Sequence, residues 1–169
     1  HCALDDMIPH MAVFIYPYVS WFPYIVVCAY LAIKNLDDRQ FKKAVLVLTT
    51  GMNIFLFISF VWPTGLNLRE GIVYDLHTLS GNLLKFVQTV DTPKSVFPSM
   101  HVYVTLVLQY TLEMQKKLVP SWGIWVGRVL AVLIVLSTMF TKQHSVLDVS
   151  AAIVMFAVLV VVVEKIVKK

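Results

Sequence analysis

The sequence predicts an all-α protein, a polytopic bundle of membrane helices that forms a single domain over residues 1–169. Two observations carry this prediction. Of the residues, 59% are hydrophobic and only 14% are charged, and the mean hydropathy is +0.77, whereas roughly a quarter of the residues in a soluble domain are charged. The apolar residues also form long uninterrupted stretches, and a helix needs roughly 17 to 25 such residues to cross a bilayer.

About five apolar stretches define the expected spans. They cover residues 11–33, 44–62, 102–112, 122–140 and 146–163. The third is short, and it reaches a spanning length only if Gln109 and Thr111 lie inside the bundle. Between the second and third spans, apolar residues at near-helical spacing predict one or two short amphipathic helices at the membrane interface, interrupted at Ser80 and Gly81.

The basic residues predict the orientation of the chain. They cluster in three expected loops or ends, at Lys34, Arg39, Lys42, Lys43, Lys116, Lys117, Lys165, Lys168 and Lys169. By the positive-inside rule these clusters face the cytoplasm, so residues 1–10, 63–100 and 141–145 share the outer side. The net charge of +4 is thus a topology signal, and we expect a lipid bilayer and no nucleic acid as partner. Short outer loops without glycosylation sequons favour a bacterial inner membrane.

A helix that opens with polar residues is the first candidate functional feature. Pro98 and Ser99 precede a long apolar run, which predicts a helix start with Ser99 as the N-cap. The unpaired backbone N–H groups and partial positive charge of a helix start suit a phosphate oxygen. His101 would then lie beside a bound anion.

A second histidine lies in the other expected outer turn. His144 and Asp148 are four residues apart, which places them on one face of a helix. A carboxylate there can accept the imidazole N–H and leave the opposite nitrogen as a nucleophile or base. Together with Ser99 and His101, this pair predicts a phosphoryl-transfer site. The neighbouring aromatic residues are interpreted instead as an interfacial belt: Tyr16, Tyr18, Trp21, Tyr24 and Trp62.

These residues resemble the integral-membrane branch of the type 2 phosphatidic acid phosphatase superfamily, abbreviated PAP2. Its signature motifs are KxxxxxxRP, PSGH and SRxxxxxHxxxD. The first motif is represented only by Arg69. The residues that resemble the second and third motifs are Pro98, Ser99, Met100 and His101, then Ser137, Thr138, His144 and Asp148.

The resemblance implies a fold and a reaction. The family core has six spans, so we expect one helix to precede this chain, and the site lies on the outer face. The implied chemistry needs no cofactor and no metal ion. His144 forms a phosphohistidine while Asp148 holds its ring, and His101 is the general acid and base. Arg69, Ser99 and the helix N-terminus hold the phosphate oxygens.

The sequence departs from the motifs at several positions. Trp62 replaces the lysine of the first motif and Thr138 the arginine of the third, so two cationic phosphate ligands are missing. Lys142 and Lys94 lie close enough in sequence to substitute, although a lysine lacks the bidentate fork of arginine. Glu70 and Met100 replace a proline and a glycine. These departures resemble the branch that contains the inositol phosphorylceramide and sphingomyelin synthases.

Three functions are therefore considered. The first is a lipid phosphate phosphatase that acts on a membrane lipid phosphate. The second is a phosphotransferase of the inositol phosphorylceramide or sphingomyelin synthase type, in which an alcohol replaces water as the acceptor. The third is an inactive lipid-binding or transport protein, against which the presence of His101, His144 and Asp148 together argues. The sequence leaves the lipid substrate and the oligomeric state open.

Overall fold

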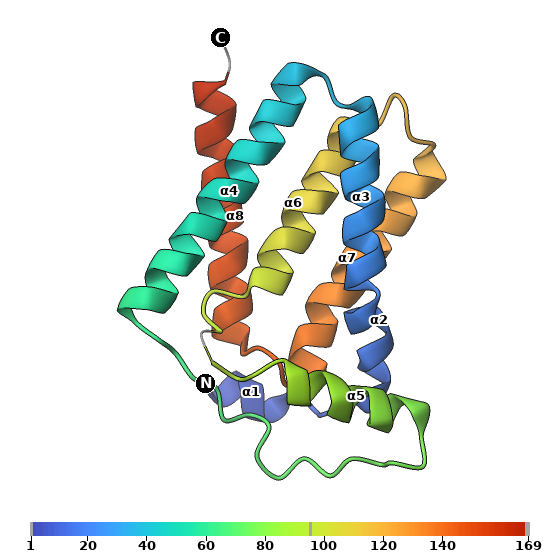
Figure 1. Ribbon diagram of the computed structural model, residues 1–169, viewed down its shortest axis with the longest axis vertical. Coiled ribbons are helices and arrows are strands. Elements are labelled where there is room, and N and C mark those ends of the chain that lie inside the picture. Colours follow the sequence, from blue (N-terminus) through green and yellow to red (C-terminus); the bar gives the residue numbers. More distant parts are fainter. Residues whose placement is uncertain (1, 95, 168–169) are drawn as a thin grey trace.

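A computed structural model describes residues 2–94 and 96–167 (Figure 1). The described residues form helices and no strand, which confirms the predicted all-α class. The elements are α1 (Ala3–Met7), η1 (Ala12–Phe14), α2 (Ile15–Val19), α3 (Trp21–Asn35), α4 (Asp38–Val61), α5 (Leu79–Val90), α6 (Met100–Met114), α7 (Ser121–Phe140) and α8 (Val146–Ile166). Lys168 and Lys169 of the basic clusters lie outside the described residues.

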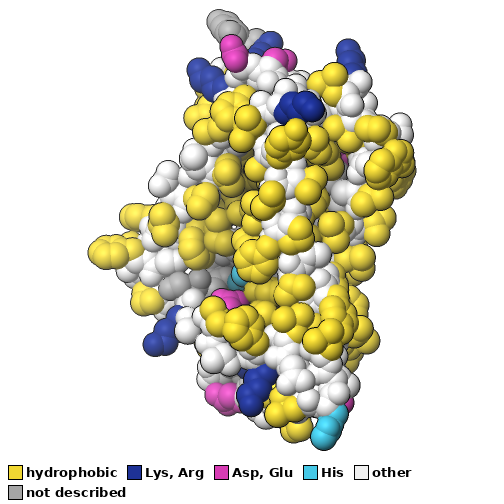
Figure 2. Space-filling view, turned by 45° about the vertical axis from the view of Figure 1, so that its right-hand side comes forward, with side chains coloured by type: hydrophobic (Ala, Val, Ile, Leu, Met, Phe, Trp, Pro, Cys, Tyr) yellow, Lys and Arg dark blue, Asp and Glu magenta, His cyan; other side chains and the backbone are white. Residues whose placement is uncertain are grey.

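Four helical segments of the described chain are long and apolar enough to cross a membrane. They are Ala12–Asn35, Asp38–Val61, Ser121–Phe140 and Val146–Ile166. The first of these combines η1, α2 and α3. Figure 2 shows hydrophobic side chains over the middle of one face of the bundle and charged side chains mostly toward its two ends. The chain is therefore an integral membrane protein.

The fifth expected span, at residues 102–112, forms a helix that lies among the others. Helix α6 has 15 residues, a length of about 22 Å, which is shorter than the roughly 30 Å hydrocarbon core of a bilayer. It packs against α3, α4, α7 and α8, and it occupies the centre of the bundle in Figure 1. Its neighbours therefore cover it on several sides.

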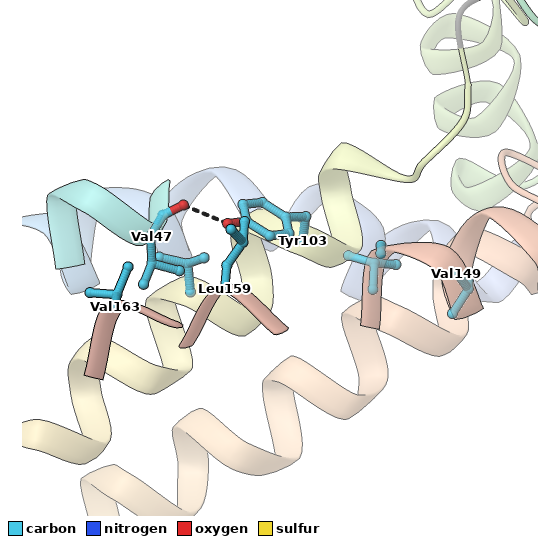
Figure 3. Close-up of a cluster of buried hydrophobic side chains, with 8 residues drawn as sticks. Val47, Tyr103, Val149, Leu159 and Val163 are labelled. Carbon is cyan, nitrogen blue, oxygen red and sulfur yellow. Dashed lines mark hydrogen bonds between the residues drawn. The ribbon is translucent and has the colours of Figure 1, made fainter. Parts of the chain in front are cut away.

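Tyr103 anchors α6 to α4 inside the bundle. Its side chain is fully buried, and its hydroxyl donates a hydrogen bond to the carbonyl oxygen of Val47 at 2.5 Å (Figure 3). The ring passes so close to Gly51 that a Cβ atom there would collide with it. Glycine at this position therefore permits the close approach of the two helices.

The predicted cytoplasmic and outer segments separate to opposite ends of the bundle. The loops between α3 and α4 and between α6 and α7 lie with the C-terminus of α8 at the upper end in Figure 1. Helices α1 and α5, the start of α6 and the turn between α7 and α8 lie at the lower end. This lower end contains every residue predicted for the site.

Within its described residues, the loop predicted to face outward contains a single helix. Helix α5 begins at Leu79, where the Thr78 hydroxyl accepts a hydrogen bond from the backbone N–H of Gly81 at 3.1 Å. Residues 71–78 are not helical, and Gly71 has a φ of 79° that favours glycine. The Ser80–Gly81 pair therefore lies in the first turn of one helix and interrupts nothing, contrary to the expectation from sequence.

Candidate functional site

Two helix starts meet at the end of the bundle that the sequence predicts to face outward. Ser99 caps α6 through its hydroxyl oxygen, which accepts from the N–H of Val102 at 3.4 Å, so the predicted helix start is confirmed. Ser145 caps α8 in the same way and forms a reciprocal capping box with Asp148. The backbone N–H of Ser99 donates to the backbone carbonyl of Asp148 at 3.1 Å. This bond ties the two helix starts together.

The two motif histidines face each other across this junction. Nδ1 of His101 lies 3.3 Å from Nε2 of His144. Nδ1 of His144 lies 3.7 Å from Oδ2 of Asp148, which is an ion-pair distance and too long for a hydrogen bond. The side chains of His144 and Asp148 are buried, and His101 is half-buried. His144 precedes the first residue of α8, so the expected position on one helix face with Asp148 is wrong. The turn brings the two groups together instead.

Tyr18 contacts the opposite side of the His101 ring. Its hydroxyl lies 3.0 Å from Nε2 of His101 and donates to Oδ2 of Asp91 at 2.9 Å. The ring of Trp21 lies 4.6 Å from that of His101, measured between centroids. Because Tyr18 is only 3% exposed, its assignment to an interfacial aromatic belt is wrong. Because Tyr18 and His101 are far apart in the sequence, no local sequence pattern predicts this contact.

A cavity of about 250 Å³ opens beside the two histidines. Its walls come from α4, α6, the outer loop and the turn before α8, and the lining residues are Phe55, Arg69, Asp91, Thr92, Lys94, Val96, Met100, His101, Gln143 and His144. Of the predicted phosphate ligands, Arg69 and Lys94 reach this wall. Ser99 does not line the cavity, but it caps the helix whose first residue, Met100, does.

Arg69 is held rigidly at the wall by neutral oxygen atoms. Its guanidinium donates to the backbone carbonyls of Asp91 and Gln88 and to the side-chain oxygen of Gln143. Its NH2 group lies 3.9 Å from Oδ2 of Asp91. Burial lowers the pKa of Arg69, and the Asp91 charge opposes that change. The Nε atom is buried and has no hydrogen-bond partner among the described residues.

Gln143 is a cavity residue that the sequence did not single out. Because an arginine can only donate hydrogen bonds, its contact with Arg69 fixes Oε1 of Gln143 toward the guanidinium. Nε2 of the Gln143 amide then points away from the Arg69 guanidinium. Gln143 is 1% exposed, and within the described chain Nε2 has no acceptor. Two buried donors, Nε of Arg69 and Nε2 of Gln143, therefore lack an acceptor at this wall.

Lys142 points away from the cavity. Its backbone has a φ of 56°, and its ammonium group donates to the backbone carbonyls of Asp5 and Ile8, both at 2.6 Å. The Asp5 carboxylate in turn accepts from the N–H of Val146 at 2.7 Å. Lys142 thus binds the N-terminal segment. The expectation that Lys142 replaces a missing cationic phosphate ligand is therefore wrong.

The fixed charges at the cavity wall are few. Arg69 and Lys94 are cationic and Asp91 is anionic. Across the described residues, no three His, Cys, Asp or Glu side chains are grouped so that they could hold a metal ion. The wall therefore offers a histidine pair, two cations and two unpartnered donors to an anionic ligand.

Comparison with known families relates the chain to a described superfamily. A family model described as the PAP2 superfamily matches residues 4–162. The matched range contains both histidines, Arg69, Lys94 and Asp148. No curated protein and no solved structure matches the chain.

Proposed function

The chain belongs to the PAP2 superfamily, and from that membership we propose that it is a metal-independent lipid phosphate phosphatase with a phosphohistidine intermediate. Superfamily members are phosphatases and phosphotransferases. The observation that carries the proposal is the approach of Nδ1 of His101 to Nε2 of His144, 3.3 Å apart, at the wall of a cavity that also contains Arg69. A nucleophile, a proton donor and an anion ligand then face one space.

In the first step, the lone pair on Nε2 of His144 attacks phosphorus. The bond from phosphorus to the lipid oxygen breaks with its electron pair on oxygen, and protonated His101 donates a proton to that oxygen. The contact between the two ring nitrogens gives way as phosphorus approaches. Asp148, 3.7 Å from Nδ1 of His144, stabilises the positive charge that develops on the ring. General acid catalysis of this kind contributes on the order of 10²- to 10⁴-fold.

In the second step, water is the acceptor. Neutral His101 takes a proton from water, the water oxygen attacks phosphorus, and the phosphorus–nitrogen bond breaks with its electrons returning to His144. Arg69, Lys94 and the N-terminus of α6 stabilise the charge on the non-bridging oxygens. Ser99 acts here through the helix that it caps.

Tyr18 and Asp91 orient the general acid. The Tyr18 hydroxyl contacts Nε2 of His101, and Asp91 accepts the hydrogen bond of that hydroxyl. The His101 ring is thereby fixed with Nδ1 toward the nucleophile. Both are positioning residues, because they act on the reaction through His101.

An apolar groove beside the site supports a lipid substrate. It lies between α4 and α8, has a volume of about 600 Å³, and is lined by Ile54, Ile58, Phe97, Pro98, Leu147, Ser150, Ala151, Val154 and Met155. Ile54 and Ile58 flank the cavity residue Phe55 on the same helix. A lipid can therefore place its phosphate in the cavity while its alkyl chain stays in the groove.

The charge distribution supports a location for the reaction. The described residues of the basic clusters lie at the end of the bundle opposite the cavity. Under the positive-inside rule the site then faces the extracytoplasmic side. A bacterial inner membrane is the proposed location.

A phosphotransferase is the second candidate. In this reaction an alcohol replaces water in the second step, and the rest of the machinery is unchanged. The observation that favours it is that the Lys142 side chain points away from the cavity. Without this ammonium group, the cavity wall lacks a cation that would bind a phosphate with two negative charges.

The test is phosphate release from a panel of lipid phosphates by detergent-purified protein in EDTA. A parallel assay measures transfer of the phosphate group to inositol. Both are repeated with His144→Ala and with His77→Ala, which removes an exposed histidine of the outer loop. Release in EDTA that is lost only in His144→Ala supports the phosphatase. Transfer without release supports the second candidate, and no activity toward any substrate contradicts both.

A further inference from the structure

The turn between α7 and α8 contains a lysine at a position where helices usually have a glycine. The backbone N–H of Lys142 donates to the carbonyl of Met139 at 3.0 Å. The N–H of Gln143 donates to the carbonyl of Thr138 at 2.9 Å. These two bonds form a Schellman motif at the end of α7, in which the residue in the left-handed conformation is usually glycine. Lys142 holds that position with a φ of 56°, although a glycine would adopt it without strain.

The Lys142 side chain attaches the N-terminal segment to this turn. Its ammonium group donates to two backbone carbonyls of residues 2–11, both at 2.6 Å, and Lys142 is only 9% exposed. The same segment has a second attachment, because the N–H of Met11 donates to the carbonyl of Phe140 at 3.0 Å. Residues 2–11, here called the N-terminal strap, are therefore held against the end of α7.

Asp5 connects the N-terminal strap to the start of α8. Its carboxylate is buried, and its two oxygens accept from the N–H groups of Val146 and Cys2, both at 2.7 Å. Val146 is the first residue of α8, and the Ser145 hydroxyl accepts only from the next two N–H groups. Asp5 thus supplies the acceptor that the Ser145 cap lacks, and a negative charge at a helix N-terminus is favourable.

We propose that Lys142 and Asp5 are positioning residues, which act on the reaction by fixing the turn on which His144 lies. The inference rests on the proposed function, in which His144 attacks phosphorus. The N–H of His144 donates to the carbonyl of Thr138 at 3.0 Å, so the nucleophile is bonded to the helix end that Lys142 attaches to the strap. Neither Lys142 nor Asp5 lines the cavity. A displacement of about 1 Å can lower a rate on the order of 10²-fold.

Two variants at position 142 separate the side chain from the backbone. Lys142→Met removes the ammonium group and keeps an unbranched side chain. Lys142→Gly removes the whole side chain, but glycine adopts a positive φ without strain, so the turn can still form. We expect both variants to lower kcat by on the order of 10- to 100-fold, with KM close to wild type because Lys142 does not line the cavity. Lys85→Met, at an exposed lysine of α5, is the matched control and should change neither constant.

Asp5→Asn tests the attachment to α8. An amide has one acceptor oxygen, whereas the Asp5 carboxylate uses two, so one backbone N–H loses its acceptor. We expect a smaller fall in kcat than in Lys142→Gly. Asp75→Asn is the matched control, because the exposed Asp75 carboxylate also accepts from a backbone N–H, that of His77 at 3.0 Å. This control should keep the kcat of the wild type.

Single-turnover kinetics distinguish a misplaced nucleophile from a loss of folded protein. Enzyme is mixed in saturating excess over a lipid phosphate, and release of the dephosphorylated alcohol is followed. The rate constant then does not depend on how much of the enzyme is folded, whereas it falls if His144 is misplaced. We expect a lower rate constant in Lys142→Gly. A wild-type rate constant in this variant overturns the inference, because the turn would then hold His144 without the ammonium group.

Hydrogen exchange tests the attachment of the strap without any turnover. We expect the backbone N–H groups of residues 143–146 to exchange faster in Lys142→Gly and Asp5→Asn than in the wild type, with α6 unchanged. If they do but the wild type turns over no lipid phosphate, the hold of the strap on the turn stands and the proposed reaction is wrong. If turnover is lost in His144→Ala but both variants keep the wild-type rate constant, the proposed function stands and the positioning role is wrong.

Discussion

Helix α6 carries a polar cluster near each end, and the two clusters differ in how well their groups are paired. In the inner cluster, Gln109 accepts from the Tyr24 hydroxyl at 2.9 Å and donates to Glu113 at 2.9 Å. Arg128 of α7 donates to both carboxylate oxygens of Glu113, at 2.6 and 2.9 Å. Lys116 adds a further ion pair to Glu113. In the described chain, none of these side chains has a buried polar atom without a partner.

The outer cluster leaves several polar atoms unpaired. Nε of Arg69, Nε2 of Gln143 and Nδ1 of His144 are all buried without a hydrogen-bond partner in the described part of the chain. Buried polar groups in folded proteins are nearly always paired, so the two unpaired donors of the cavity residues Arg69 and Gln143 indicate a place for a ligand. Nδ1 of His144 instead faces Asp148 at 3.7 Å. The inner cluster fixes helices to each other, whereas the outer cluster leaves donors free for the proposed substrate.

Removal of the general acid should give the largest effect. We expect His101→Ala to lower kcat by on the order of 10²- to 10⁴-fold, because both proton transfers pass through this ring. Turnover of the lipid substrate and the thermal unfolding midpoint are measured together. A midpoint close to wild type assigns the loss to chemistry, and a kcat within a few-fold of wild type would contradict the role of His101.

Loss of the Tyr18 hydroxyl should have a smaller effect on the same cluster. We expect Tyr18→Phe to lower kcat by about tenfold, the effect of about 1.4 kcal/mol in the transition state, with little change in KM. The reason is that the hydroxyl orients His101 and does not contact the phosphate. Tyr16→Phe, at a more exposed tyrosine of the same helix, is the control. Equal losses in both variants would show that the hydroxyl of Tyr18 has no special role.

Disruption of the inner cluster should affect stability without affecting chemistry. We expect Arg128→Ala to lower the thermal unfolding midpoint while kcat and KM stay at wild-type values, because this cluster lies away from the cavity and joins α6 to α7. Arg128→Lys keeps the charge but loses the bidentate fork, so its unfolding midpoint should lie between those of the wild type and Arg128→Ala. A selective loss of kcat in Arg128→Ala would show that the clusters are coupled.

The smallest effect is expected at the rim of the inner cluster. The Lys116 side chain is 61% exposed, and exposed ion pairs contribute little to stability. Lys116→Ala should therefore keep both the unfolding midpoint and kcat of the wild type. A clear fall in the midpoint would mean that Glu113 depends on Lys116 as well as on Arg128.

The parts of the fold and site that depend on local signals could be predicted from sequence. The apolar stretches located the helices, and the residues around Ser99 located the start of α6, because capping acts within one turn. The apolar stretch at 102–112 was already short in the sequence. The structure explains this length, because α6 packs against other helices on several sides.

The remaining site residues depend on contacts between distant segments. Tyr18 contacts His101 from a position 83 residues earlier in the chain, and Asp91 contacts Tyr18. The residue types of Tyr18 and Asp91 fit an ordinary membrane interface or loop equally well. The direction of Lys142 follows from its backbone φ, which its identity does not reveal. Gln143 gave no signal because a neutral amide beside a histidine has no distinctive pattern.

The backbone bond from Ser99 to Asp148 has a consequence for how such a protein can diversify. Main-chain atoms join the two helix starts beside His101 and His144, and that bond does not depend on the identity of wall residues such as Phe55. Positions such as Phe55, Thr92 and Val96 can therefore change over generations, or in a designed library, while the bond between the two helix starts is kept. New substrates become accessible by reshaping the wall alone.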